Sequence, residues 1–76
     1  MPKLPIISGK ELIKYLKKKG FVFSRQKGSH VVLKSPNSFR VTVPLHKELD
    51  RGTLLEILAE AHISKEEFLK EWYGKK

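Results

Sequence analysis

Three capping boxes, in which a Ser or Thr is followed three residues later by Glu, indicate where helices begin in this chain. They pair Ser8 with Glu11, Thr53 with Glu56, and Ser64 with Glu67. Apolar residues follow each box at helical spacing, so we expect helices that begin at about Gly9 and just after Thr53 and Ser64. Gly20 fits the position just beyond the first helix, where the backbone often turns left-handed.

Three short segments between the first two helices have the composition of β-strands. They are "FVFSRQ" (21–26), "SHVVLK" (29–34) and "FRVTV" (39–43). The predicted order is α-β-β-β-α followed by a short C-terminal helix. An antiparallel three-stranded sheet with the helices on one face buries one side of each element, which is an α+β fold. No repeat or linker interrupts the sequence, so residues 1–76 are predicted to form a single domain.

The register of the sheet follows from the positions of its turns. If Lys27-Gly28 and Pro36-Asn37 are the turn centres, one face carries the predicted core side chains: Phe21, Phe23, Val32, Phe39, Val41 and Val43. His30 would then lie at the end of this face, opposite Arg25. A bulge at Gly28 would shift the strand by one residue and turn His30 outward, so both orientations stay open.

Charge and composition restrict the classes of function. Lys and Arg number 16 against 8 Asp and Glu, a formal net charge of +8 on 76 residues. Such a charge favours polyanions, nucleic acid first, although a cationic surface can also serve solubility alone. The chain has no Cys, and its three His residues are widely spaced; we therefore expect neither a metal site nor another cofactor. The absence of a signal peptide and of a membrane-length apolar run predicts a cytoplasmic protein.

His30 is the main candidate for chemistry, and its alternative is a purely structural role. It cannot form a nucleophilic pair with Ser29, because neighbouring strand residues point to opposite faces. It could instead act as a general base on RNA, whose 2′-hydroxyl is an internal nucleophile. Arg25, Lys27 and Lys34, on the same predicted hairpin, would then bind phosphate and stabilise the charge of the transition state.

Other residues have simpler interpretations. Gly28 is more easily explained by a turn that needs positive φ than by phosphate contact. His46 follows the last predicted strand and is a loop residue, an RNA contact or a second acid or base, of which we favour the first. His62, near a helix C-terminus, is assigned no chemistry.

Several ordered motifs resemble those of one protein family. "GFVFSRQKGSHVVLKSP" and "VTVPLHKELDRGTLLEILAEAHIS" contain G-F, R-Q-x-G-S-H, V-P-x-H and G-T-L-x-x-I-L in this order. Together they resemble the HicA family of bacterial and archaeal toxins, and the similarity extends from about Ile6 to Trp72. It implies a fold like that of the double-stranded-RNA-binding domain. It also implies a toxin of a type II toxin-antitoxin system that cleaves mRNA independently of the ribosome, and a HicB-type antitoxin that masks its site.

The resemblance also implies roles for individual residues. The His of G-S-H is catalytic in this family, which corresponds to His30. Gly28 and Ser29 belong to the same motif and His46 to V-P-x-H, so all three are candidates for RNA binding. One position departs from the family pattern: where a Gly usually follows the second long helix, this chain has His62. A left-handed conformation there would be less comfortable for His than for Gly or Asn.

Three functions therefore compete. The first is a metal-independent endoribonuclease with His30 as general base. The second is a non-catalytic RNA-binding module of the same fold. Double-stranded-RNA binders are expected to have a basic cluster at the start of the second long helix, whereas "HKELDRGT" is mixed in charge, which favours the first. The third is a regulatory protein whose basic surface docks an acidic partner.

Overall fold

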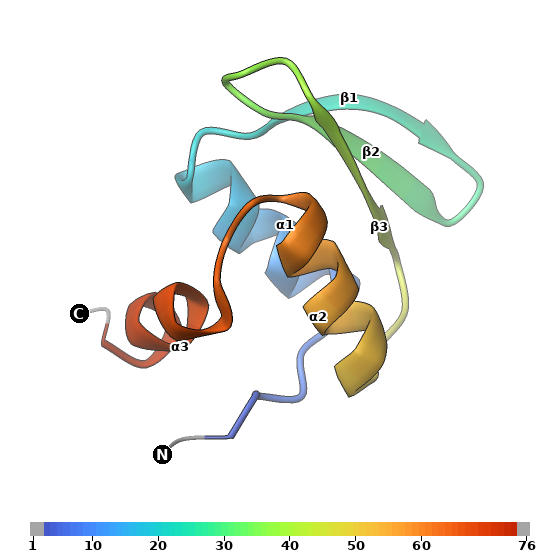
Figure 1. Ribbon diagram of the computed structural model, residues 1–76. Helices are drawn as coiled ribbons and strands as arrows, with labels where there is room; N and C mark the ends of the chain where they lie inside the picture. Colours follow the sequence, from blue (N-terminus) through green and yellow to red (C-terminus); the bar gives the residue numbers. More distant parts are fainter. Residues whose placement is uncertain (1–2, 75–76) are drawn as a thin grey trace.

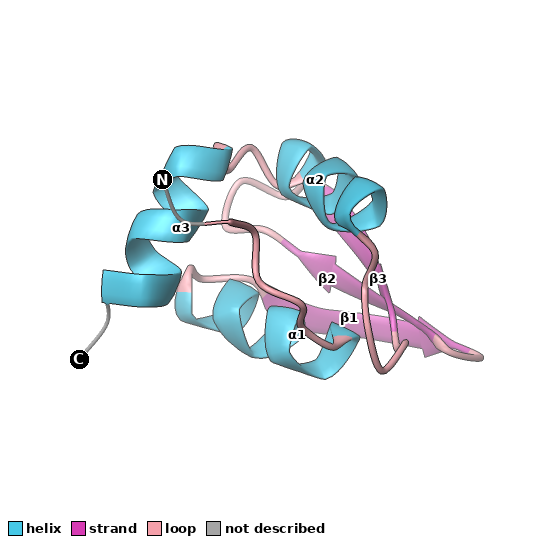
Figure 2. Cartoon of the chain, turned by 90° about the horizontal axis from the view of Figure 1, so that it is seen from below, coloured by secondary structure: helices cyan, strands magenta, loops and turns pink. Residues whose placement is uncertain are grey.

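The elements follow one another in the predicted order. A computed structural model describes residues 3–74 of the chain. Its elements are α1 (Gly9–Lys18), β1 (Val22–Lys27), β2 (His30–Lys34), β3 (Arg40–Pro44), α2 (Arg51–Glu60) and α3 (Lys65–Gly74). The strands form one antiparallel sheet in the order β1-β2-β3. Because α1 and α2 cover the same face of this sheet (Figures 1 and 2), the predicted α+β architecture is confirmed.

The limits of α1 are those that the sequence predicts. The Ser8 side chain accepts a hydrogen bond from the Glu11 backbone N–H at 3.1 Å, and the Glu11 carboxylate accepts one from the Ser8 N–H at 2.9 Å. This reciprocal pair is a complete capping box. At the other end, Gly20 has φ 102° and donates to the Lys17 carbonyl, while the next N–H, of Phe21, donates to Leu16. These bonds form a Schellman motif.

The start of α2 differs from the prediction. The helix is capped by Asp50, whose carboxylate accepts a hydrogen bond from the Thr53 N–H at 2.7 Å. This bond lowers the pKa of the Asp50 carboxyl. Thr53 is therefore already inside the helix, and the predicted box with Glu56 is wrong. An Asp three residues before Thr53 is as good a capping acceptor as Thr itself, and it lets the helix start earlier.

The last helix starts as the sequence predicts. The Ser64 hydroxyl accepts a hydrogen bond from the Glu67 backbone N–H at 3.0 Å, and α3 begins at the next residue, Lys65. This is the capping half of the box. α3 packs on α1 through Phe68, which is fully buried and meets the Tyr15 ring edge to face.

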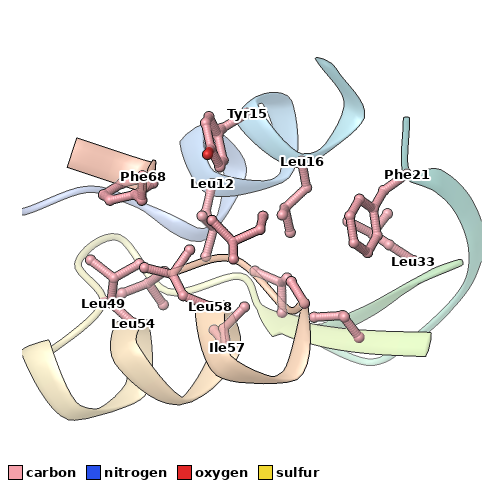
Figure 3. Close-up of a cluster of buried hydrophobic side chains, with 14 of the residues drawn as sticks. Leu12, Tyr15, Leu16, Phe21, Leu33, Leu49, Leu54, Ile57, Leu58 and Phe68 are labelled. Atoms are coloured by element: carbon pink, nitrogen blue, oxygen red, sulfur yellow. The ribbon is translucent and has the colours of Figure 1, made fainter. Parts of the chain in front are cut away.

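The core lies between the sheet and the helices (Figure 3). Its fully buried large side chains come from all three helices and from β2 and β3: Phe68, Leu12, Leu16, Leu33, Leu54, Leu58, Val41 and Val43. Phe21, Val41 and Val43 are buried and Phe39 is partly buried, as predicted from the sequence. No such side chain comes from β1, whose six residues are all exposed. β1 therefore contributes hydrogen bonds to the sheet rather than apolar burial.

The predicted register of β2 is wrong. The turn is centred on Gly28-Ser29, so Lys27 pairs with His30 and Arg25 pairs with Val32. This shift reverses the faces of β2, because the side chains of a strand alternate. Val31 and Leu33 are buried instead of Val32, which is half-buried on the opposite face. The sequence contains the reason, since Gly followed by Ser is a pattern of two-residue hairpin turns with positive φ at the first position.

Phe23 is also not the core residue that the sequence predicted. It pairs with the buried Leu33, yet 53% of its surface is exposed. The register shifts by one residue between Phe23 and Arg25, so that Ser24 forms a β-bulge. A bulge bends the strand that contains it. Because β1 is an edge strand and none of its residues is buried, the neighbourhood of Phe23 lacks the cover that the centre of the sheet has.

His62 adopts the left-handed conformation that its position in the family pattern suggests. Its φ is 61°, and it follows the residue that caps α2. His is among the residues other than Gly that enter this region more often than most, still at some cost. Its ring lies against that of Phe39, with centroids 4.2 Å apart. This contact offsets part of the backbone cost, so His62 has a structural explanation.

The start of α1 lies directly against the end of β3. The Gly9 N–H donates a hydrogen bond to the His46 carbonyl at 2.9 Å. A Cβ at position 9 would overlap the carbonyl oxygen of Pro44. Only Gly therefore allows this close approach, which joins the helix layer to the sheet.

Gly9→Ala should lower the free energy of unfolding by about 1–3 kcal/mol, because the new methyl group forces α1 and β3 apart. Gly52→Ala is the matched control: its Cβ would meet only Asp50, at an ordinary 3.8 Å. We expect that control to be neutral or up to about 1 kcal/mol more stable. Urea denaturation of both variants measures the difference, and equal stability of the two would contradict the close contact.

A polar cluster joins α1 to α3. The Tyr15 hydroxyl donates to Glu71 at 2.7 Å, and Lys19 Nζ donates to both Glu67 and Glu71. Burial and the bond to Glu71 raise the pKa of Tyr15. The bonds from Tyr15 and Lys19 lower the pKa of Glu71 below its ordinary value of 4.5. Ionised Glu71 therefore stabilises the folded state above about pH 4.5.

This stabilisation should disappear as the pH falls from about 4.5 through the folded-state pKa of Glu71. Because 41% of the Glu71 side chain is exposed, we expect a contribution of about 1 kcal/mol or less. Glu71→Gln should remove this part of the acid sensitivity, whereas Glu66→Gln, on the same helix, should not. Thermal melts of the three proteins between neutral and acidic pH test the prediction, and parallel curves for both variants would refute it.

Candidate active site and nucleic-acid interface

His30 is the first residue of β2 and lies on the sheet face that the helices do not cover. It is exposed, whereas its neighbour Val31 is buried. Its cross-strand partners are Lys27 on β1 and Pro44 on β3. The orientation that the sequence left open is thus settled as outward. Arg25, which was expected opposite His30, lies one row farther along, beside Val32.

The turn before His30 is held by local hydrogen bonds. Gly28 has φ 60°, and a Cβ there would meet nothing within 4 Å, so the position needs glycine for its backbone and not for space. The Gln26 side chain donates to the Gly28 carbonyl at 2.9 Å. The Ser29 carbonyl accepts from the Leu45 N–H at 2.6 Å. These bonds fix the hairpin end beside the segment that follows β3.

The outer face, meaning the sheet face away from the helices, has three rows of cross-strand neighbours. From the turn outward the rows are Lys27-His30-Pro44, Arg25-Val32-Thr42 and Val22-Lys34-Arg40. All three rows contain at least one cation, and none contains an acid, because residues 21–47 include no Asp or Glu. The predicted cations Arg25, Lys27 and Lys34 therefore share one face with His30. Such a surface attracts phosphate groups.

Arg40 is a member of this face that the sequence analysis did not include among the candidates. It is exposed and pairs directly with Lys34. A signal for it was present, since Arg40 and Thr42 alternate with the buried Val41 and Val43. Alternation of this kind places a polar residue on the opposite face from the core.

His46 lies two residues beyond Pro44, in the loop between β3 and α2, as we favoured from the sequence. The residue is exposed, and its backbone carbonyl receives the bond from Gly9. It is close enough to Asp50 to contribute slightly to the lowered pKa of that carboxyl, after the bonds from Thr53. Leu45, its neighbour in the chain, donates its N–H to the Ser29 carbonyl, so this segment borders the row of His30.

His30 is exposed and lies outside two hollows on the described surface. One hollow lies between α1 and α3, and the other lies near Phe39 and His62. Small-molecule sites are usually concave and largely apolar. An exposed imidazole beside several cations on one sheet face suits an extended polyanion.

Two further observations concern metals and membranes. Among residues 3–74, no group of three or more His, Cys, Asp or Glu residues could hold a metal ion. No helix in this part of the chain is long and apolar enough to cross a membrane.

Comparison with known proteins adds an independent finding. Residues 9–63 match the family described as the HicA toxin of bacterial toxin-antitoxin. No curated protein matches the chain significantly. The matched range is more than half of the 76 residues and contains the whole sheet, α1, α2, His30 and His46. The chain therefore belongs to the HicA family of toxins from toxin-antitoxin systems.

Proposed function

We propose that this protein is a metal-independent and ribosome-independent endoribonuclease that cleaves mRNA in the cytoplasm, with His30 as its general base. The observation that supports this most is the exposed position of His30 on a sheet face with four cations and no acid. Membership of a toxin family adds to it. A HicB-type antitoxin that covers this face would keep the toxin inactive.

The chemistry requires only a base, a phosphate site and RNA. His30 removes the proton from a ribose 2′-hydroxyl, and the oxygen attacks the adjacent phosphorus. The bond from phosphorus to the 5′-oxygen breaks, and a proton from solvent or from an acidic side chain restores that oxygen to a hydroxyl. The products are a 2′,3′-cyclic phosphate and a 5′-hydroxyl fragment. In this proposal Lys27, which pairs with His30 across the hairpin, stabilises the charge on the reacting phosphate.

The other candidate residues have supporting roles in this proposal. Arg25 and Lys34 bind phosphates farther along the outer face. Gly28 and Ser29 bring the hairpin backbone close to the RNA, and the positive φ of Gly28 is consistent with a turn shaped by its glycine. His46 contacts RNA from the loop beside the row of His30. No cofactor takes part.

The mixed charge at the start of α2 favours single-stranded over double-stranded RNA as the ligand. The first turn of α2 carries no acidic residue but is capped by Asp50, close to Glu48, so its start is mixed in charge. This is not the basic cluster expected of a protein that crosses a major groove. A non-catalytic RNA-binding module remains the alternative that the cleavage experiment decides.

His30→Ala should abolish RNA cleavage and leave the fold intact, because it removes a proton acceptor from an exposed position. The measurement is incubation of antitoxin-free protein with single-stranded mRNA in EDTA, followed by analysis of the fragment ends for cyclic phosphate. Circular dichroism of the variant checks its folding, and His62→Asn serves as the histidine control, because His62 has no role in the chemistry and Asn tolerates its positive φ. Cleavage by His30→Ala at the wild-type rate would remove His30 from the mechanism. RNA binding without cleavage by the wild type would favour the binding module.

Lys27→Ala should weaken RNA binding and reduce the slope of log K against log salt by about 0.7, the value for one phosphate contact on a single strand. Lys70→Ala, which removes an exposed lysine from α3, should leave that slope almost unchanged. Fluorescence titrations at several salt concentrations provide the slopes. An identical slope for the wild type and Lys27→Ala would indicate a lysine that is merely solvated.

A further inference from the structure

The row farthest from His30 carries positive charge that no ion pair among residues 3–74 neutralises. Lys34 on β2 and Arg40 on β3 are direct cross-strand partners, so their side chains leave the same face side by side, with Cβ atoms about 5 Å apart. Like charges directly opposite each other destabilise a sheet. The third residue of the row, Val22, is apolar and 57% exposed. The row therefore has two cations and no acid.

No other element supplies the missing negative charge. Both side chains are exposed, and among residues 3–74 neither Lys34 nor Arg40 takes part in an ion pair. The acidic residues Glu67 and Glu71 are bound to Lys19 at the α1-α3 contact. Two adjacent cations destabilise the sheet when no counter-ion lies between them. An anion bound from outside the chain would remove this repulsion.

The distance to His30 determines which anion fits. Lys34 lies four residues from His30 along β2, which corresponds to about 13 Å at the rise of an antiparallel strand. One phosphate group cannot contact both ends of that span. Arg25, in the middle row, lies between them. The outer face thus has cations at regular intervals along the strand direction, as an extended phosphodiester chain would require.

We propose that Lys34 and Arg40 form a second phosphate-binding subsite, which holds the RNA backbone about 13 Å along β2 from His30. This inference rests on the proposed function for the identity of its ligand. The two side chains bind one phosphate between them, and the anion removes their mutual repulsion. The subsite takes no part in the chemical step. It makes affinity depend on RNA length, because a dinucleotide at His30 is too short to reach it.

The test measures binding of RNA that cannot be cleaved. Oligomers of 2′-O-methyl RNA, from a dinucleotide to a decanucleotide, lack the 2′-hydroxyl nucleophile but keep every phosphate. The double variant Lys34→Gln/Arg40→Gln is compared with Lys14→Gln/Lys70→Gln. The control pair removes the same charge from exposed positions on α1 and α3. Thermal melts at low salt verify folding, and the single variant Arg40→Gln provides a second, milder change.

We expect wild-type affinity to rise once the oligomer is long enough to reach Lys34 and Arg40. The double variant should lose this rise, bind the decanucleotide roughly tenfold more weakly, and show a salt slope lower by about 0.7. Its affinity for the dinucleotide should change little, and the control pair should behave like the wild type. Arg40→Gln should show a smaller loss in the same direction.

Equal weakening of both double variants would overturn the subsite and leave only the overall charge as the cause. Unchanged binding of the decanucleotide by Lys34→Gln/Arg40→Gln would overturn the subsite as well. It would favour an acidic protein as the partner of these two side chains. Cleavage of unmodified RNA by the wild type is measured in parallel. A protein that does not cleave but keeps the length-dependent step contradicts the proposed nuclease and not the subsite.

Discussion

Burial of alternate side chains on β2 and β3 orients the candidate-site residues of these two strands. Val31 and Leu33 are held beneath the helices, and the period of two along a strand then forces His30 and Lys34 to the other face. The same rule places Arg40 outward on β3. A slip of one residue would bury the imidazole and expose the core. The apolar core and the cationic face are therefore two consequences of one register.

The close approach of α1 to β3 connects this sheet to the rest of the molecule. The N–H of Gly9 bonds to the carbonyl of His46, and the N–H of Leu45 bonds to the carbonyl of Ser29. The short segment after Pro44 is thus bound on one side to the helix layer and on the other to the turn before the candidate base. These are backbone bonds, so they hold the turn in place while its side chains remain free to meet a substrate.

Local signals predicted the helices well and the strand register poorly. Ser8 and Glu11 cap α1 through bonds within four residues, which is why a short sequence pattern is sufficient. At α2, two acceptors compete, and Asp50 rather than Thr53 caps the helix because it allows three more residues to join it. Register is harder, since shifting the turn centre by one residue reverses a whole strand. The dipeptide Gly28-Ser29 indicated the turn that the structure has. A turn centred on Lys27-Gly28 also placed apolar residues, among them Phe21 and Val32, on one face, so the apolar pattern did not distinguish the two.

The candidate site shows the same difference between features that local sequence predicts and features that depend on strand pairing. The amino-acid sequence alone established the order of elements, the excess of positive charge and the absence of acids between residues 21 and 47. Its motifs resembled those of the family to which the chain belongs. Strand pairing in the folded chain established that His30 faces outward, that Lys27 rather than Arg25 is its partner, and that Lys34 meets Arg40. Composition and local hydrogen bonds depend on residues near one another in the chain. Which side chains share a face depends on pairing between strands, and that is decided by which register buries the core.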